Sequence, residues 1–187
     1  MLESLLTGTR KLSLWLTWAG GTLIVLSAFL VTLEIILRKI FNVSLGGADE
    51  ISGYAFGVAT AFALSYALFE RAHIRVDALM GAIPRKLHAL VNLLGLVLLI
   101  GFALVVVSTV WGMVGDTLKH SSRSITPMRV PLAIPQIPWL IGWLLFVAAG
   151  VLLGLVAIKR YFQGDHAGVQ DLIGVKSIDE QIEDESV

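Results

Sequence analysis

The sequence predicts an all-α integral membrane protein whose four transmembrane helices form a compact bundle. Its 187 residues have a mean hydropathy of +0.82. Only 15% of them are charged, against about 25% in ordinary soluble domains, which is too few to cover a soluble protein of this size. Four apolar runs are each long enough to cross about 30 Å of hydrocarbon as a helix. They cover residues 12–37, 51–69, 87–115 and 137–158.

The first apolar run is interpreted as a retained helix rather than a signal peptide. Arg10 and Lys11 precede it, as in a secretory signal, but the run has about 25 residues where the apolar region of a signal has about 7–15. It ends on Arg38 and Lys39 without a small-residue cleavage motif. Since the connectors between the four runs are too short for a further domain, residues 1–163 are predicted to form one membrane domain.

The formal net charge of zero is the sum of two unlike parts of the chain. Residues 164–187 carry seven acids and one base, a net charge of −6, and residues 1–163 carry +6. With four spans, both termini and the connector between the second and third spans share one side. That side has nine Lys and Arg residues and the other has five, which predicts cytoplasmic termini. The acidic tail is expected to be disordered, with a short amphipathic helix as the alternative.

Catalytic and cofactor chemistry finds little support in the sequence. The chain has no cysteine, and its four histidines lie at or outside the ends of the apolar runs, so none faces another at depth as haem binding requires. No base accompanies a serine within a span, and there is no nucleotide-binding motif. His73 and Asp77 lack an evident third metal ligand. We therefore expect no enzyme activity, no cofactor and no metal site.

Polar residues that could fix the helix geometry gather at the ends of the spans. Glu34 is the one ionisable residue clearly inside a span, and Arg38, four residues later on the same face, is expected to pair with it. Asp49 and Glu50 open the second span, where acids favour the positive end of the helix dipole and Asp49 could cap the helix. Residues 70–77 are expected to form a short interfacial segment between the second and third spans.

A row of small residues follows one face of the second span. Gly53, Gly57, Ala61 and Ser65 recur there at four-residue intervals. Small residues let helix backbones approach closely, which drives helix association in lipid. The row has two interpretations, close packing within the bundle and docking against another membrane subunit, and both could hold on different faces.

Several strings of residues, taken in order, match a known family. They are Arg38 at the end of the first span, Phe41-Asn42-Val43-Ser44-Leu45, the pair Asp49-Glu50, the string Ala72-His73-Ile74-Arg75-Val76-Asp77, and Pro84-Arg85-Lys86 before the third span. In this pattern the chain resembles the small permease subunit of tripartite ATP-independent periplasmic (TRAP) transporters, over about residues 10–160. Its most specific part runs from Glu70 to Asp77. The family often has a tryptophan shortly before the acidic pair, where this chain has Gly46 and Gly47.

The resemblance implies a subunit with no transport cycle and no substrate-binding site of its own. In such systems a periplasmic substrate-binding protein captures an organic acid, typically a carboxylate, and delivers it to a large multi-span permease subunit that uses a sodium gradient. The small subunit would lie in the bacterial inner membrane among lipid, without a nucleic acid partner, and would brace the large subunit as a scaffold. The residues expected to fix its two connectors are Arg38, Asp49 and Glu50 on the outer side and His73, Arg75 and Asp77 on the cytoplasmic side.

Two other functions compete with the scaffold. One is a self-contained carrier or channel formed by an oligomer of this chain, with Glu34 lining the path. The other is an assembly or regulatory membrane protein that acts through its acidic tail.

Overall fold

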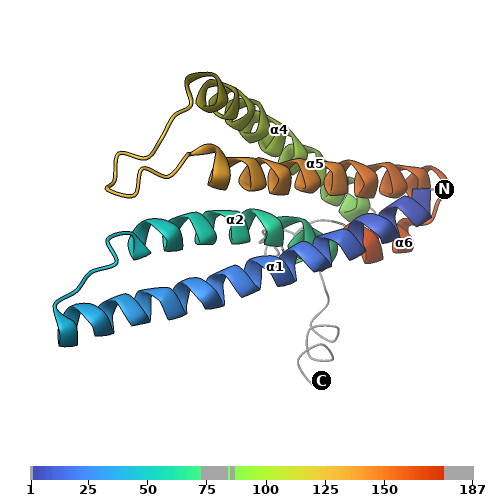
Figure 1. Ribbon diagram of the computed structural model, residues 1–187. Coiled ribbons are helices and arrows are strands. Elements are labelled where there is room, and N and C mark those ends of the chain that lie inside the picture. The colour runs from blue at the N-terminus through green and yellow to red at the C-terminus, as the bar shows by residue number, and fades with distance from the viewer. Residues whose placement is uncertain (1, 73–83, 85–86, 175–187) are drawn as a thin grey trace.

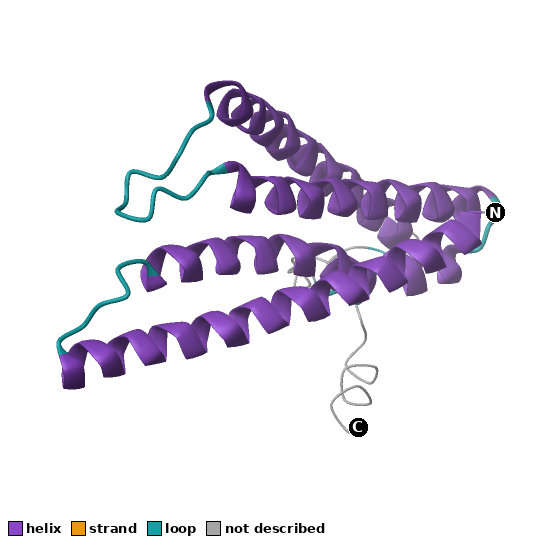
Figure 2. Ribbon diagram, viewed as in Figure 1, coloured by secondary structure: helices purple, strands orange, loops and turns teal. Residues whose placement is uncertain are grey.

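The computed structural model describes residues 2–72, 84 and 87–174, and these residues are almost entirely helical (Figures 1 and 2). The helices are α1 (Leu2–Ile36), continued by the π-helical turn η1 (Leu37–Phe41), α2 (Ala48–Phe69), α4 (His88–His120), α5 (Ala133–Phe162) and α6 (His166–Ile173). No strand is found within the described part of the chain. Four of the helices are long and apolar enough to cross a membrane. The predicted all-α fold with four membrane-length helices is therefore confirmed.

The helices extend beyond the apolar runs that predicted them. Helix α1 begins ten residues before the first run, and α4 ends five residues after the third. Backbone hydrogen bonding does not stop where the side chains become polar, so hydropathy locates a span better than it locates the helix ends.

Helix α5 lies at the centre of the bundle. It packs against α1, α2, α4 and α6, and the helices follow one another across the molecule in the order α1, α2, α5, α4 (Figure 1). The main core lies where α6 meets the bundle and includes Leu68, Leu96, Phe146 and Leu153. A smaller cluster of Val110, Val114 and Leu140 joins α4 to α5 farther along.

The contact between α1 and α2 follows a seven-residue repeat. The buried residues of α1 are Ser13, Gly20, Ser27 and Glu34, each seven positions after the last. A repeat of seven keeps one face of a helix against its partner along a slightly supercoiled pair. The repeat brings the backbones close, because a Cβ added at Gly20 would lie 3.0 Å from the Cα of Ala59.

The small-residue row on α2 divides between two environments. Ala61 and Ser65 are buried, and a Cβ added at Gly142 of α5 would lie 2.8 Å from the carbonyl carbon of Ala61. By contrast, a Cβ added at Gly53 or Gly57 would meet no atom within 4 Å. Close packing within the bundle thus holds for one half of the row only.

The first part of the acidic tail is helical in the structure, whereas disorder was expected after residue 163. Residues 166–173 form α6, the short helix that was the alternative, and it packs against α4 and α5. Val169 and Ile173, one turn apart on one face, are 0% and 2% exposed. Although the tail is acidic overall, these two residues bury enough apolar surface to seat one helix. Residues 175–187 lie outside the described residues.

Candidate functional site

Most of the polar side chains singled out from the sequence lie at one end of the bundle. This connector end contains residues 42–47 and 121–132, which lie together on the left of Figure 1. The opposite, terminal end contains the start of α1, the end of α2 and α6. Glu34, Arg38, Asp49 and Glu50 belong to the connector end. The predicted cytoplasmic candidates His73, Arg75 and Asp77 lie outside the described residues.

The connector between α1 and α2 folds back over Glu34. It leaves α1 through the turn η1, after which Asn42 adopts the left-handed conformation with φ 52°, a conformation that asparagine tolerates at helix ends. Ser44 Oγ then donates a hydrogen bond to Glu34 Oε1 over 2.6 Å, and the backbone N–H of Leu45 donates to Oε2 over 2.7 Å. Glu34 is 8% exposed. Both oxygens of this buried carboxylate are therefore bound by the chain's own connector.

Among the described residues, Glu34 and Arg38 do not form the direct ion pair that the sequence suggested. The direct partners of the carboxylate are Ser44 and Leu45, and Arg38 is exposed and acts on Glu34 by longer-range attraction. The turn η1 helps explain the difference, since a π-helical turn changes the regular i,i+4 spacing on which the pairing was predicted.

Glu50 joins α2 to the loop between α4 and α5. Its Oε1 accepts a hydrogen bond from the Tyr54 hydroxyl over 2.7 Å, and its Oε2 accepts one from the Thr126 hydroxyl. Thr126 lies near the tip of a loop that is closed by a bond from the Ser124 N–H to the Val130 carbonyl. Glu50 thus connects two segments that lie 76 residues apart in the sequence.

Asp49 does not cap α2, as the sequence suggested it could. The N-cap position is taken by Gly47, which makes no side-chain cap, and Asp49 is exposed in the first turn of the helix. There it still favours the positive end of the helix dipole. The Met128 side chain lies so close to Gly47 that a Cβ at this position would overlap its sulfur.

The four candidates at the connector end line a single polar cavity of about 290 Å³. The lining residues are Glu34, Arg38, Ser44, Gly46, Gly47, Ala48, Asp49, Glu50, Thr126 and Pro127. Two of its three carboxylates use both oxygens in hydrogen bonds: Glu34 binds the connector after α1, and Glu50 binds Tyr54 of its own helix and Thr126 of the loop between α4 and α5. In the part of the chain that the structure describes, no three His, Cys, Asp or Glu residues group as metal ligands would. The arrangement is that of a joint between segments.

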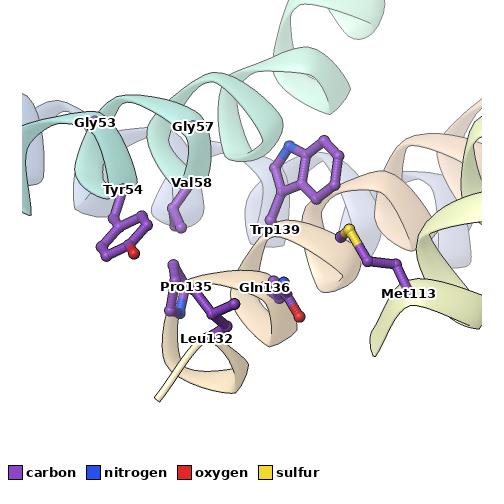
Figure 3. A pocket seen from close by; sticks show the side chains of 9 residues that line it. All are labelled: Gly53, Tyr54, Gly57, Val58, Met113, Leu132, Pro135, Gln136 and Trp139. Carbon is purple, nitrogen blue, oxygen red and sulfur yellow. The ribbon is translucent and has the colours of Figure 1, made fainter. Parts of the chain in front are cut away.

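Gly53 and Gly57 open onto an apolar groove of about 220 Å³ between α2, α4 and α5 (Figure 3). Figure 3 shows the Tyr54 and Val58 side chains directed toward α5, with Trp139 farther along the groove. The remaining lining residues are Met113, Leu132, Pro135 and Gln136. These glycines therefore leave a space beside α2 rather than a tight helix contact.

At the terminal end, Arg10 forms an ion pair with Glu70. The distance from Arg10 Nη2 to Glu70 Oε1 is 2.8 Å, and this is the one salt bridge found among the described residues. It joins the start of α1 to the end of α2. Sequence reasoning did not identify this pair, nor the bonds of Ser44, Tyr54 and Thr126. The seven-residue repeat of α1 was a usable signal for the α1–α2 register, but the register alone does not place the loop that holds Thr126.

Comparison with known proteins gives one family. The family model for the DctQ component of tripartite ATP-independent periplasmic transporters matches residues 27–163. The matched region contains the connector end, α2, α4 and α5, and it ends three residues before α6 begins. No curated protein and no solved structure matches the chain.

Proposed function

Because the chain belongs to the DctQ family and is thus a small membrane subunit of a TRAP transporter, we propose that it braces the large permease subunit and carries no substrate itself. In this proposal the chain is the stationary part of the complex, and the sodium-coupled movement of an organic acid takes place in the large subunit. A periplasmic binding protein supplies that organic acid.

The observation that carries the proposal is that Glu34 is buried and already hydrogen-bonded within the chain. It is the only charged side chain buried among the described residues, and both of its oxygens are bound to the adjacent connector. A carrier needs polar groups that are available to an ion or substrate along the path. The other buried polar residues are neutral: Ser13, Ser27, Ser65, Asn92 and Thr117. This composition favours a brace over the alternative oligomeric carrier that uses Glu34.

The proposed orientation places the connector end in the periplasm and both termini in the cytoplasm of the bacterial inner membrane. The nine Lys and Arg residues on the side of the termini, against five on the other side, support it. In this orientation the polar cavity faces the compartment of the binding protein. Large apolar side chains exposed on the outer surfaces of α1 and α4, among them Trp15, Phe29, Phe102 and Trp111, are then available to lipid and to the large subunit.

The proposal is tested with two substitutions at Glu34 in proteoliposomes that contain both membrane subunits. In Glu34→Gln the amide oxygen accepts from the Leu45 N–H, and the amide group donates to the Ser44 hydroxyl, which reverses its own role. Glu34→Leu removes both acceptors. If the chain is a brace, Glu34→Gln retains sodium-dependent uptake and Glu34→Leu loses it through a weakened complex.

The control is reconstitution of each subunit alone with the loaded binding protein. The proposal expects no substrate flux from the small subunit by itself. Flux from the small subunit alone would refute the brace. Loss of uptake in Glu34→Gln while the complex still assembles would also refute it and would identify Glu34 as a transport residue.

A further inference from the structure

Helix α4 lies at one edge of the bundle (Figure 1). It packs against α5 and α6, whereas α5 contacts four other elements. Near the connector end, α4 is joined to α5 by the cluster of Val110, Val114 and Leu140. Its contacts at the terminal end are different, because there α6 lies beside the start of α4 and the end of α5 (Figure 1).

The apolar face of α6 completes the core at the terminal end. Val169 and Ile173 belong to the same buried cluster as Ala89 and Leu96 of α4 and Ala157 of α5. All five residues are less than 5% exposed. The start of α4 is therefore covered by a segment that follows the four membrane-length helices in the sequence.

Polar contacts attach α6 to both of its neighbours. Asn92 of α4, itself 3% exposed, donates from Nδ2 to Gln170 Oε1 over 2.7 Å. Arg160 of α5 donates from Nη1 to the Gly168 carbonyl over 3.0 Å. Asp165 caps α6 by accepting from the Gly168 N–H over 2.8 Å. The first two hydrogen bonds join α6 to α4 and to α5, and the third closes the first turn of α6 itself, so the helix has a defined position and not only an apolar contact.

We propose that α6 is a clasp that holds the terminal end of α4 against α5 before any partner binds. The family match ends at residue 163, so the clasp is a feature of this chain outside the matched region. Without α6, the apolar residues at the start of α4 and the amide of Asn92 lose their cover, and the end of α4 separates from α5. The clasp does not depend on the brace proposed above, because its effect is read in the isolated chain.

The absence of cysteine from the sequence permits a direct test. A single Ala89→Cys reporter is placed in the full-length chain in nanodiscs, and its labelling rate with a water-soluble maleimide is measured. The variant Val169→Asp places a charge in the buried face of α6. Asp171→Asn, on the exposed side of the same helix, is the matched control. We expect labelling of Ala89→Cys to accelerate at least about tenfold with Val169→Asp, as expected when a buried contact is lost, and to stay unchanged with Asp171→Asn.

A second reporter separates release of the clasp from unfolding of the chain. Ser13 lies in the α1–α2 contact and is 0% exposed. The Ser13→Cys substitution replaces only the side-chain oxygen by sulfur. The proposal requires its labelling to stay slow when Val169→Asp exposes Ala89→Cys. If Val169→Asp exposes both reporters, the milder Val169→Ala replaces it and must accelerate Ala89→Cys alone. Equal labelling of Ala89→Cys with and without the α6 substitutions, or parallel acceleration of both reporters with Val169→Ala, would overturn the clasp.

Discussion

Replacing Gly142 by alanine is expected to destabilise the chain although alanine is the better helix former. Gly142 of α5 lies directly against Ala61 of α2. A Cβ at this position would be 2.8 Å from both the carbonyl carbon and the Cβ of Ala61, and 2.9 Å from its carbonyl oxygen. Two of these atoms are backbone atoms and cannot rotate away. The helices must therefore separate to accept a single methyl group.

The expected magnitude follows from two opposing effects. Overpacking in a well-packed interior costs about 1–3 kcal/mol, and the higher helix propensity of alanine returns up to about 1 kcal/mol. Because the contacted backbone atoms of Ala61 cannot rotate away, the upper part of this range, about 2–3 kcal/mol, applies, and the net loss in the free energy of unfolding is about 1–2 kcal/mol. For a chain of this length, each kcal/mol shifts Tm by roughly 2–4 °C. Gly142→Ala should therefore lower Tm by about 2–8 °C.

The assay is thermal unfolding of the purified chain in detergent, followed by tryptophan fluorescence, to which Trp143 contributes beside the substituted position. Gly101→Ala is the matched control, because a Cβ at Gly101 of α4 meets no atom within 4 Å. This control should leave Tm unchanged or raise it. Gly20→Ala should fall between the two, since its Cβ would lie 3.0 Å from a backbone atom of Ala59. A Tm for Gly142→Ala equal to or above that of Gly101→Ala would refute the close α2–α5 contact.

Three further predictions concern the polar contacts at the two ends. Glu34→Leu should lower Tm well below that of Glu34→Gln, because only the leucine leaves the Leu45 N–H without an acceptor, and equal Tm values would contradict the role of Glu34 as a connector anchor. A double-mutant cycle of Glu50→Gln and Thr126→Val should give a coupling free energy clearly above zero in chemical unfolding, whereas additive effects would mean that this bond does not hold the loop. Arg10→Ala should cost less than about 1 kcal/mol, with a smaller cost at high salt, because its ion pair with Glu70 is partly exposed, 58% at Arg10 and 30% at Glu70; a larger loss in the same unfolding assay would show a desolvated pair.

Hydropathy predicted the four spans because a membrane imposes one length and one polarity on every helix that crosses it. It could not predict which residues of a span meet a neighbour. Gly57 and Ala61 are equivalent in the sequence pattern, yet Ala61 lies against Gly142 and Gly57 opens onto a groove. The difference depends on where α5 crosses α2, which is a property of two helices together and not of the row of small residues on one of them.

The polar site was predictable in its residues and not in its bonds. Charge at the span ends identified Glu34 and Glu50, because an ionisable side chain in or near the hydrocarbon is costly and usually has a structural or functional role. Their partners are a backbone N–H from a connector and a hydroxyl from a distant loop. Such partners have no charge or periodicity that a sequence pattern could reveal. Similarly, the net charge of the tail favoured disorder over the short amphipathic helix that residues 166–173 form, with Val169 and Ile173 buried.

The contacts at the two ends of α1 hold the register of the α1–α2 pair, which would suit the stationary role proposed above. Along the middle of the α1–α2 pair the buried side chains of α1 are small, and small residues alone would let two helices slide past each other in steps of a turn. Such a shift of about 5.4 Å would break the bonds of Glu34 to Ser44 and Leu45 at the connector end. It would also break the ion pair of Arg10 with Glu70 at the terminal end. Because both ends oppose the same movement, the register of the pair is held without a large side chain at its centre.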